Sequence, residues 1–165
     1  MARLLHFTDM HLRINQPGTA SDPLRLSRSM PDALDRLAEQ IKELTPDVLV
    51  MSGDLLDVPD EVKDGGTPDD RSHEEWVESA KADFQLIRDW FDATAVPYVV
   101  VPGNHDLEGA FADVFEPPPK PRDIAGLRFF CFWDELADDK QPLRTGARKE
   151  QFEDDLTNPE HDCPQ

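Results

Sequence analysis

Three short apolar runs in the chain each end at a cluster of polar residues. Each run is as long as a strand and rich in Leu, Val or Phe, so we expect β-strands over residues 3–8, 48–51 and 96–101. The turns after them carry Asp9-Met-His11, Gly53-Asp54 and Gly103-Asn-His-Asp106. The carboxyl ends of parallel strands meet at one edge of a sheet, so the pattern predicts that these side chains gather into one site.

Helical periodicity fills the spaces between these strands. We expect one helix from about Pro31 to Leu44, starting behind a capping box at Ser29. A second helix is predicted over 73–94 by the apolar stripe of Trp76, Ala80, Phe84, Ile87 and Phe91. The β-α-β order implies parallel strands joined by right-handed crossovers.

The other segments show weaker patterns. Residues 12–29 and 58–72 are predicted to be loops, the second a mobile insertion or lid. Arg25 and Arg28 in the first loop are expected to pair with surface acids, with contact to an anionic substrate as the alternative. Further on we expect a short helix around Phe111–Phe115, a fourth strand over 126–133, and a helix over 147–156 anchored by Phe152 and Leu156.

Length and composition fit one globular domain over residues 1–165. No apolar run is long enough to cross a membrane, and the N-terminal run is too short for a signal peptide, so we expect a cytoplasmic protein. The two cysteines, Cys131 and Cys163, do not suggest a disulfide framework, and Cys131 is expected to be a buried free thiol.

The charge balance is strongly acidic, with 35 acids against 17 bases and a net charge of -18. Such a chain lacks the basic surface that nucleic-acid binding without sequence preference requires, so a nucleic-acid partner is not expected. An acidic, Lys-poor surface would suit a high-salt cytoplasm, and an ordinary acidic protein is the alternative.

The polar clusters contain the ligand types that divalent metals use. Asp9, His11, Asp54 and Asn104 offer oxygen donors and one imidazole, a set that suits Mn, Fe, Zn or Co. A single Asp-x-His occurs often by chance, and a Pro-Gly turn with solvated polar residues would be the plain interpretation of the third cluster. Three such clusters at three strand ends favour a metal site.

These motifs together resemble those of the calcineurin-like metallophosphoesterase superfamily, over residues 3 to about 108. The resemblance implies an αββα sandwich with two divalent metal ions at the edge of a sheet. By that likeness Asp9 and His11 would hold the first metal, Asp54 would bridge both, and Asn104 would hold the second. His105 would act on the leaving-group oxygen, oriented by Asp57, the last residue of Gly53-Asp-Leu-Leu-Asp57, and we expect this carboxylate to raise the pKa of His105.

The sequence departs from the family pattern after Asp106. Relatives carry a further histidine and then a Gly-His-x-His motif, whereas only His161 follows here. We therefore expect a domain truncated at its C-terminus, an incomplete second metal site, and some self-association through an exposed sheet edge.

The function implied by the resemblance is metal-dependent hydrolysis of a small phosphodiester or phosphomonoester by a hydroxide that two metal ions activate. A truncated, non-catalytic metal-binding or interaction module is one alternative. A fragment of a DNA-repair-type nuclease is another, because that branch shares the same motifs.

Overall fold

The computed structural model describes residues 2–18, 22, 24–116, 121–137, 139 and 141–157. Its centre is a parallel three-stranded sheet in the order β1-β2-β3. The strands are β1 (Leu4–Phe7), β2 (Val48–Ser52) and β3 (Tyr98–Val101), each within two residues of its expected bounds. The mixed α/β class and the parallel strands predicted from the sequence are confirmed.

Two long helices connect these strands. After the short 3-10 helix η1 (Ser27–Ser29), α1 spans Met30–Leu44, and α3 spans His73–Thr94 as predicted. The capping box expected at Ser29 is wrong, because Ser29 belongs to η1 and lacks the extended backbone of a capping residue. A capping box is formed instead at the start of α3, where Ser72 and Glu75 exchange hydrogen bonds.

Two segments expected to be irregular or short contain helices. The polar segment 58–72 includes the one-turn helix α2 (Asp60–Lys63), which begins behind Pro59 and has acids in its first turn. The short helix predicted around Phe111–Phe115 is α4 (Glu108–Phe115), which packs on α3 through a perpendicular contact of Phe111 with Phe84.

The fourth strand predicted over 126–133 is confirmed only over Leu127–Phe129. The structure contains an antiparallel hairpin, β4 (Arg122–Ile124) and β5 (Leu127–Phe129), because Ala125 and Gly126 both adopt positive φ and reverse the chain. A second small antiparallel pair, β6 (Glu135–Leu136) and β7 (Pro142–Leu143), precedes the helix α5 (Gly146–Thr157). Leu156 does not anchor this helix, since its side chain is exposed.

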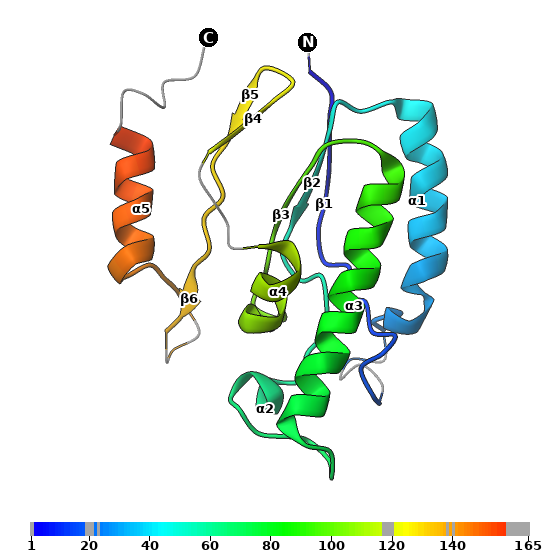
Figure 1. Cartoon of the computed structure of the whole chain (residues 1–165), viewed down its shortest axis with the longest axis vertical. Helices are drawn as coiled ribbons and strands as arrows, with labels where there is room; N and C mark the ends of the chain where they lie inside the picture. The colour runs from blue at the N-terminus through cyan, green and yellow to red at the C-terminus, as the bar shows by residue number, and fades with distance from the viewer. Residues whose placement is uncertain are drawn as a thin grey trace.

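The elements are arranged in layers around the central sheet. Figure 1 shows α1 and α3 on one side of the sheet, the β4-β5 hairpin on the other, and α5 beyond the hairpin. Alternate residues of β2 supply both cores: Leu49 and Met51 pack with the helices, whereas Val48 packs with Val99 and Cys131 on the hairpin side. Cys131 is a free, buried thiol as expected, and Cys163 lies outside the described residues.

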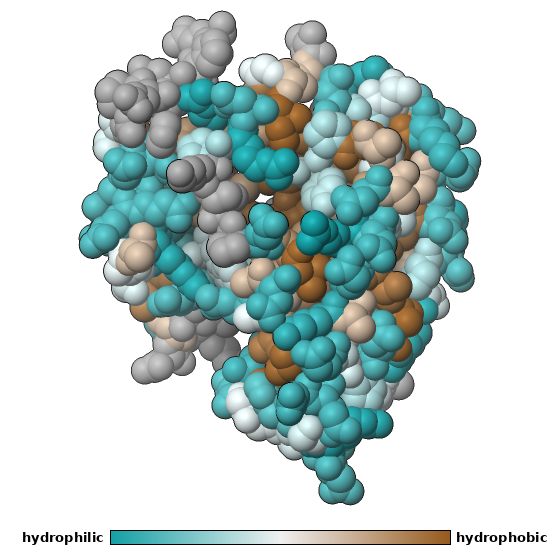
Figure 2. Space-filling view, viewed as in Figure 1, coloured by the Kyte–Doolittle hydropathy of each residue, from teal (hydrophilic) through white to brown (hydrophobic). Residues whose placement is uncertain are grey.

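Polar residues cover most of the face shown in Figure 2, with small apolar areas between them. Among the helices that the structure describes, none combines the length and the hydrophobicity needed to cross a membrane.

Candidate metal centre

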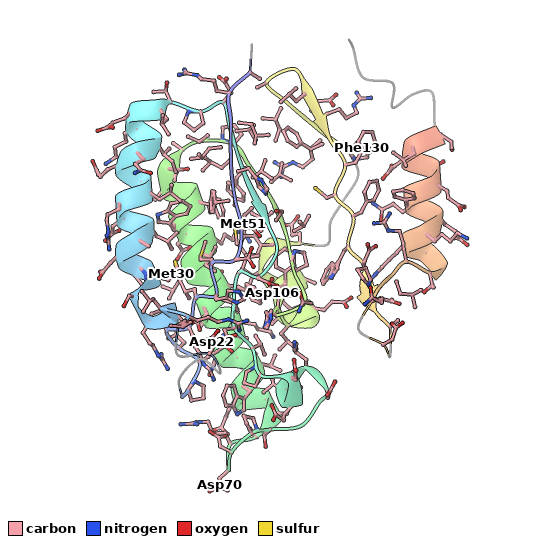
Figure 3. The ribbon with its side chains drawn as sticks, turned by 180° about the vertical axis from the view of Figure 1, so that it is seen from behind. Asp22, Met30, Met51, Asp70, Asp106 and Phe130 are labelled. Atoms are coloured by element: carbon pink, nitrogen blue, oxygen red, sulfur yellow. The ribbon has the colours of Figure 1, made fainter. Side chains whose placement is uncertain are left out.

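The three polar clusters come together at the carboxyl edge of the sheet. The turn after β1 is bound to the turn after β2 by two backbone hydrogen bonds, Asp9 N to Gly53 O at 3.3 Å and His11 N to Asp54 O at 2.9 Å. Gly53 N donates in turn to Val101 O of β3 at 2.9 Å. Figure 3 shows Asp106, from the turn after β3, beyond Met51 at this end of the sheet.

The backbone at this edge is unusual for residues with side chains. Asp9, His11 and Asp54 have φ values of 58°, 47° and 54°, in the left-handed region that such residues rarely adopt. Backbone of this kind is retained where the surrounding structure holds it, and it is common at functional sites. Gly103 is required for a steric reason, because a Cβ there would lie 2.2 Å from Asp54 Oδ1.

Three predicted ligands face one another across a short gap. His11 Nε2 lies 3.8 Å from Asp9 Oδ1 and 3.9 Å from Asp54 Oδ2, and one ligand atom from each residue fits within 4.8 Å of the others. These separations are too long for hydrogen bonds. They leave room between the donors for an ion that each could bind at about 2.0–2.2 Å. The residues present therefore fit a divalent metal.

The exposure of these ligands is graded. The side chains of His11 and Asp54 are 12% and 15% exposed, whereas that of Asp9 is 61% exposed. His11 and Asp54 thus form the fixed inner wall of the centre, and Asp9 faces solvent, from which an ion would enter.

Asp57 lies behind this group, buried and surrounded by cationic and imidazole groups. Its Oδ1 accepts a hydrogen bond from Arg25, and its Oδ2 lies 3.7 Å from Arg13 Nη1. His11 Nδ1 and His105 Nδ1 lie 3.9 Å and 3.7 Å from Asp57 Oδ1. A second possible ligand group, His11 with Asp57 and His105, therefore contains a carboxylate already paired with guanidinium groups. The group built on Asp9 is the better candidate for a metal site.

His105 sits beside the predicted metal ligands, with Asp57 nearby but beyond hydrogen-bond distance. Its backbone N–H donates to Asp54 Oδ1 at 3.1 Å, and its Nε2 lies 3.4 Å from Arg25 Nη2. The expectation that its pKa is raised is wrong. Burial lowers the pKa of His105, and the positive charges of Arg25 and Lys63 add to this, against the opposing effect of Asp54.

Asn104 is the predicted ligand about which the structure says least. It is exposed, and its backbone carbonyl accepts a hydrogen bond from Lys63 Nζ at 2.7 Å. Asn104 directly precedes His105, so both residues belong to the turn that reaches the centre. The role of Asn104 as a ligand stays a prediction. His161, the candidate replacement ligand, lies outside the described residues.

The sequence shows Asp106 as the last residue of the third polar cluster, but it does not predict the structural role of this side chain. Its buried carboxylate accepts hydrogen bonds from the N–H groups of Gly103, Leu55 and Leu56 at 2.8, 3.1 and 2.7 Å. These bonds join the turn that carries Asp54 to the turn that carries His105. Burial raises the pKa of Asp106 to about 7, although the three N–H donors oppose this shift.

Arg25 and Arg28 differ from the expectation that both pair with surface acids. Arg25 pairs with a buried acid, Asp57, and Arg28 donates to backbone carbonyls of its own loop, including that of Gln16 at 2.7 Å. The residue types alone could not reveal these partners, because long-range packing brings them together.

A cavity of about 490 Å³ opens beside the centre. Its lining includes His105, Asp57 and Arg13 together with residues of α2, Pro68 and Trp76. The space is of the size of a small-molecule pocket and adjoins the histidine predicted to act on a leaving group.

A search among curated proteins found no match to the chain. A family model described as calcineurin-like phosphoesterase matches residues 2–161, nearly the whole chain. The chemistry of that family is metal-dependent hydrolysis of phosphate esters, and the Asp and His groups at this sheet edge are of the type that could bind the metal. The chain belongs to the calcineurin-like phosphoesterase family.

Proposed function

We propose that this protein hydrolyses small phosphodiesters or phosphomonoesters at the centre built on Asp9, His11 and Asp54. The observation that carries the proposal is the convergence of these three ligand atoms within 4.8 Å at the carboxyl edge of the sheet. A divalent ion bound there, Mn, Fe, Zn or Co, would polarise the phosphoryl group and activate water. Asp54 and Asn104 would hold a second ion.

The protein's own groups would do the remaining chemistry. His105 is 27% exposed and borders the cavity, so its imidazole can reach a leaving-group oxygen. Arg25 lies beside His105 Nε2 and adds positive charge where the phosphoryl group would bind. Asp57 would hold Arg25 and the two imidazoles in place rather than share a proton with His105.

The cavity and the charge support a small substrate. A space of about 490 Å³ accommodates a compact leaving group. The acids around it include Asp60, Glu61 and Asp69, which would repel a polyanionic nucleic acid. The nuclease alternative therefore has less support than a small ester, and the proposal keeps the cytoplasmic location expected from the sequence.

We further propose that the protein holds one metal tightly and a second one weakly. Among the described residues, three side chains would serve the first ion, and only Asp54 and Asn104 would serve the second.

We also propose self-association through β1, because β1 is an edge strand of the sheet and Leu4 is 46% exposed. Sedimentation of the purified chain over a range of concentrations would test this part.

The function is tested by measuring Mn²⁺ binding calorimetrically and hydrolysis of bis-p-nitrophenyl phosphate in Mn²⁺. Asp54→Asn is expected to abolish both, because it removes the carboxylate central to the site. Asp89→Asn on the exposed side of α3 is the matched control and should change neither. Unaltered metal binding and turnover in Asp54→Asn would refute the proposal, and metal binding without turnover in the unaltered chain would favour the non-catalytic module.

A further inference from the structure

A buried acid on α3 holds the loop that follows the metal ligand His11. Asp83 has no exposed surface, and its carboxylate accepts hydrogen bonds from the backbone N–H groups of Ile14, Asn15 and Gln16 at 3.1, 2.7 and 3.1 Å. The amide side chains of Asn15 and Gln16 donate to the same carboxylate at 2.9 and 3.4 Å. Five N–H donors thus converge on one buried anion, a strong and specific anchor.

The same loop is bound from its other side by Arg28 of η1. The guanidinium of Arg28 donates to the backbone carbonyls of Ile14, Gln16 and Gly18. The backbone N–H groups therefore point inward to Asp83 and the carbonyl groups point outward to Arg28. A loop without regular secondary structure is fixed in this way by two charged side chains.

This loop leads directly into the metal centre. Leu12 N donates to Leu55 O at 2.8 Å, which joins the residue after His11 to the residue after Asp54. The next residue, Arg13, has a buried guanidinium that donates to Pro17 O of the same loop and lies 3.7 Å from Asp57 Oδ2. The position of Arg13, and through it the charge balance at Asp57, depends on the conformation of the loop.

We propose that Asp83 is a positioning residue of the metal centre, which fixes the loop at residues 13–17 so that His11 and Arg13 are held against Asp54 and Asp57. This inference rests on the proposed metal site. The carboxylate is needed for both of its oxygens, because a carboxamide has one acceptor oxygen and would turn an NH₂ group toward N–H donors. A residue that only stabilises the core would leave metal affinity unchanged once the protein is folded.

The test compares Mn²⁺ affinity in the full chain, measured calorimetrically, between the unaltered protein, Asp83→Asn and Phe84→Leu. Phe84 is the next residue of α3, equally buried, and its ring contacts are with Phe111 and Phe115 of the α4 segment. Asp83→Asn should weaken Mn²⁺ binding about tenfold, the lower end of the loss for residues that support metal ligands. Phe84→Leu should lower stability and leave the affinity within about twofold of the unaltered value. The absorption spectrum of bound Co²⁺ should also change in Asp83→Asn and stay the same in Phe84→Leu.

A second variant covers the case in which Asp83→Asn does not fold. Arg28→Gln loosens the same loop from its exposed side and should weaken Mn²⁺ binding in the same direction. Unchanged affinity and spectrum in either folded loop variant, or an equal loss of affinity in Phe84→Leu, would overturn the inference while leaving the metal site intact. Failure of the unaltered chain to bind Mn²⁺ would instead refute the proposed function, and this role of Asp83 with it.

Discussion

The two parts of the chain, residues 2–116 and 121–157, are stabilised in different ways. The first part contains nearly all the fully buried apolar side chains, including Leu49, Phe84 and Phe91. In the described residues of the second part, only Cys131 and Asp155 are buried, and they keep 7% and 6% of their surface exposed. That part relies instead on arginines placed over aromatic rings, with Arg144 Cζ 4.1 Å from the centre of the Phe152 ring and Arg148 Cζ 5.1 Å from that of Trp133.

The candidate metal centre belongs entirely to the first part in the region that the structure describes. Its loops are fixed by buried hydrogen bonds to Asp83 and Asp106, which the dense core keeps away from water. The second part touches the first through Cys131 on β2 and β3 and through Trp133 on Phe111. A precise site therefore rests on a closely packed core, whereas the covering layer is held by partly exposed contacts that tolerate more change.

The largest effect is expected from opening the first core. Phe84→Ala removes a fully buried ring that contacts Phe111 and Phe115, so it should lower the free energy of unfolding by about 3–5 kcal/mol. Urea denaturation followed by circular dichroism measures this change. Leu86→Ala, on the exposed side of the same helix, is the control and should cost far less. Similar losses in the two variants would contradict the packing described here.

A smaller effect is expected at the junction of the turns that carry Asp54 and His105. Asp106→Asn leaves one acceptor oxygen where two served the N–H groups of Gly103, Leu55 and Leu56, so it should cost about 1–3 kcal/mol of stability. It should also weaken Mn²⁺ binding, because the turn that carries Asp54 loses its support. Thermal unfolding and calorimetry measure both, with the exposed Asp113→Asn as control. An unchanged Mn²⁺ affinity in Asp106→Asn would show that the two turns keep their conformation without the hydrogen bonds to Asp106.

The second part should respond more weakly to loss of a ring. Phe152→Ala removes the perpendicular contact with Phe132 at 4.8 Å and the stacking of Arg144, and we expect a loss of about 1 kcal/mol. Leu156→Ala on the same helix should have almost no effect, since Leu156 is exposed. Urea denaturation provides the comparison. A loss as large as that of Phe84→Ala would remove the contrast between the two parts.

A pH-dependent effect is expected at Tyr98, at the start of β3. Burial, with a hydrogen bond to Asp92 at 2.8 Å, raises the pKa of Tyr98 to about 12. The folded state then holds this proton more tightly than the unfolded state, whose value is about 10, so stability should fall as pH rises between the two values. Tyr98 is the only tyrosine, so phenolate absorbance reports it directly. Asp92→Asn should lower the midpoint, and a folded protein with a midpoint near 10 would contradict the assignment.

The local patterns of the sequence were sufficient for the elements that bury one face. The stripe from Trp76 to Phe91 predicted α3 to the residue, because spacing alone determines which face of a helix is apolar. The three strands and their parallel direction followed from continuous apolar runs and β-α-β alternation. The hairpin at 122–129 was missed because an apolar run cannot say which strand it will pair with, and the turn at Ala125-Gly126 was not a recognised reversal signal.

For the candidate metal centre, the sequence by itself determined which functional groups are available. The strand ends carry Asp9, His11, Asp54, Asn104 and His105, and the parallel direction of the strands brings these ends to one edge of the sheet. Only the tertiary structure decided what surrounds them. Asp57 faces Arg13 and Arg25 as well as two histidines, and Asp83 holds a loop almost seventy residues away in sequence. The local sequence does not predict such pairings, because the partners of a buried charge are set by which distant segments pack around it. The same packing buries His105 and so lowers its pKa.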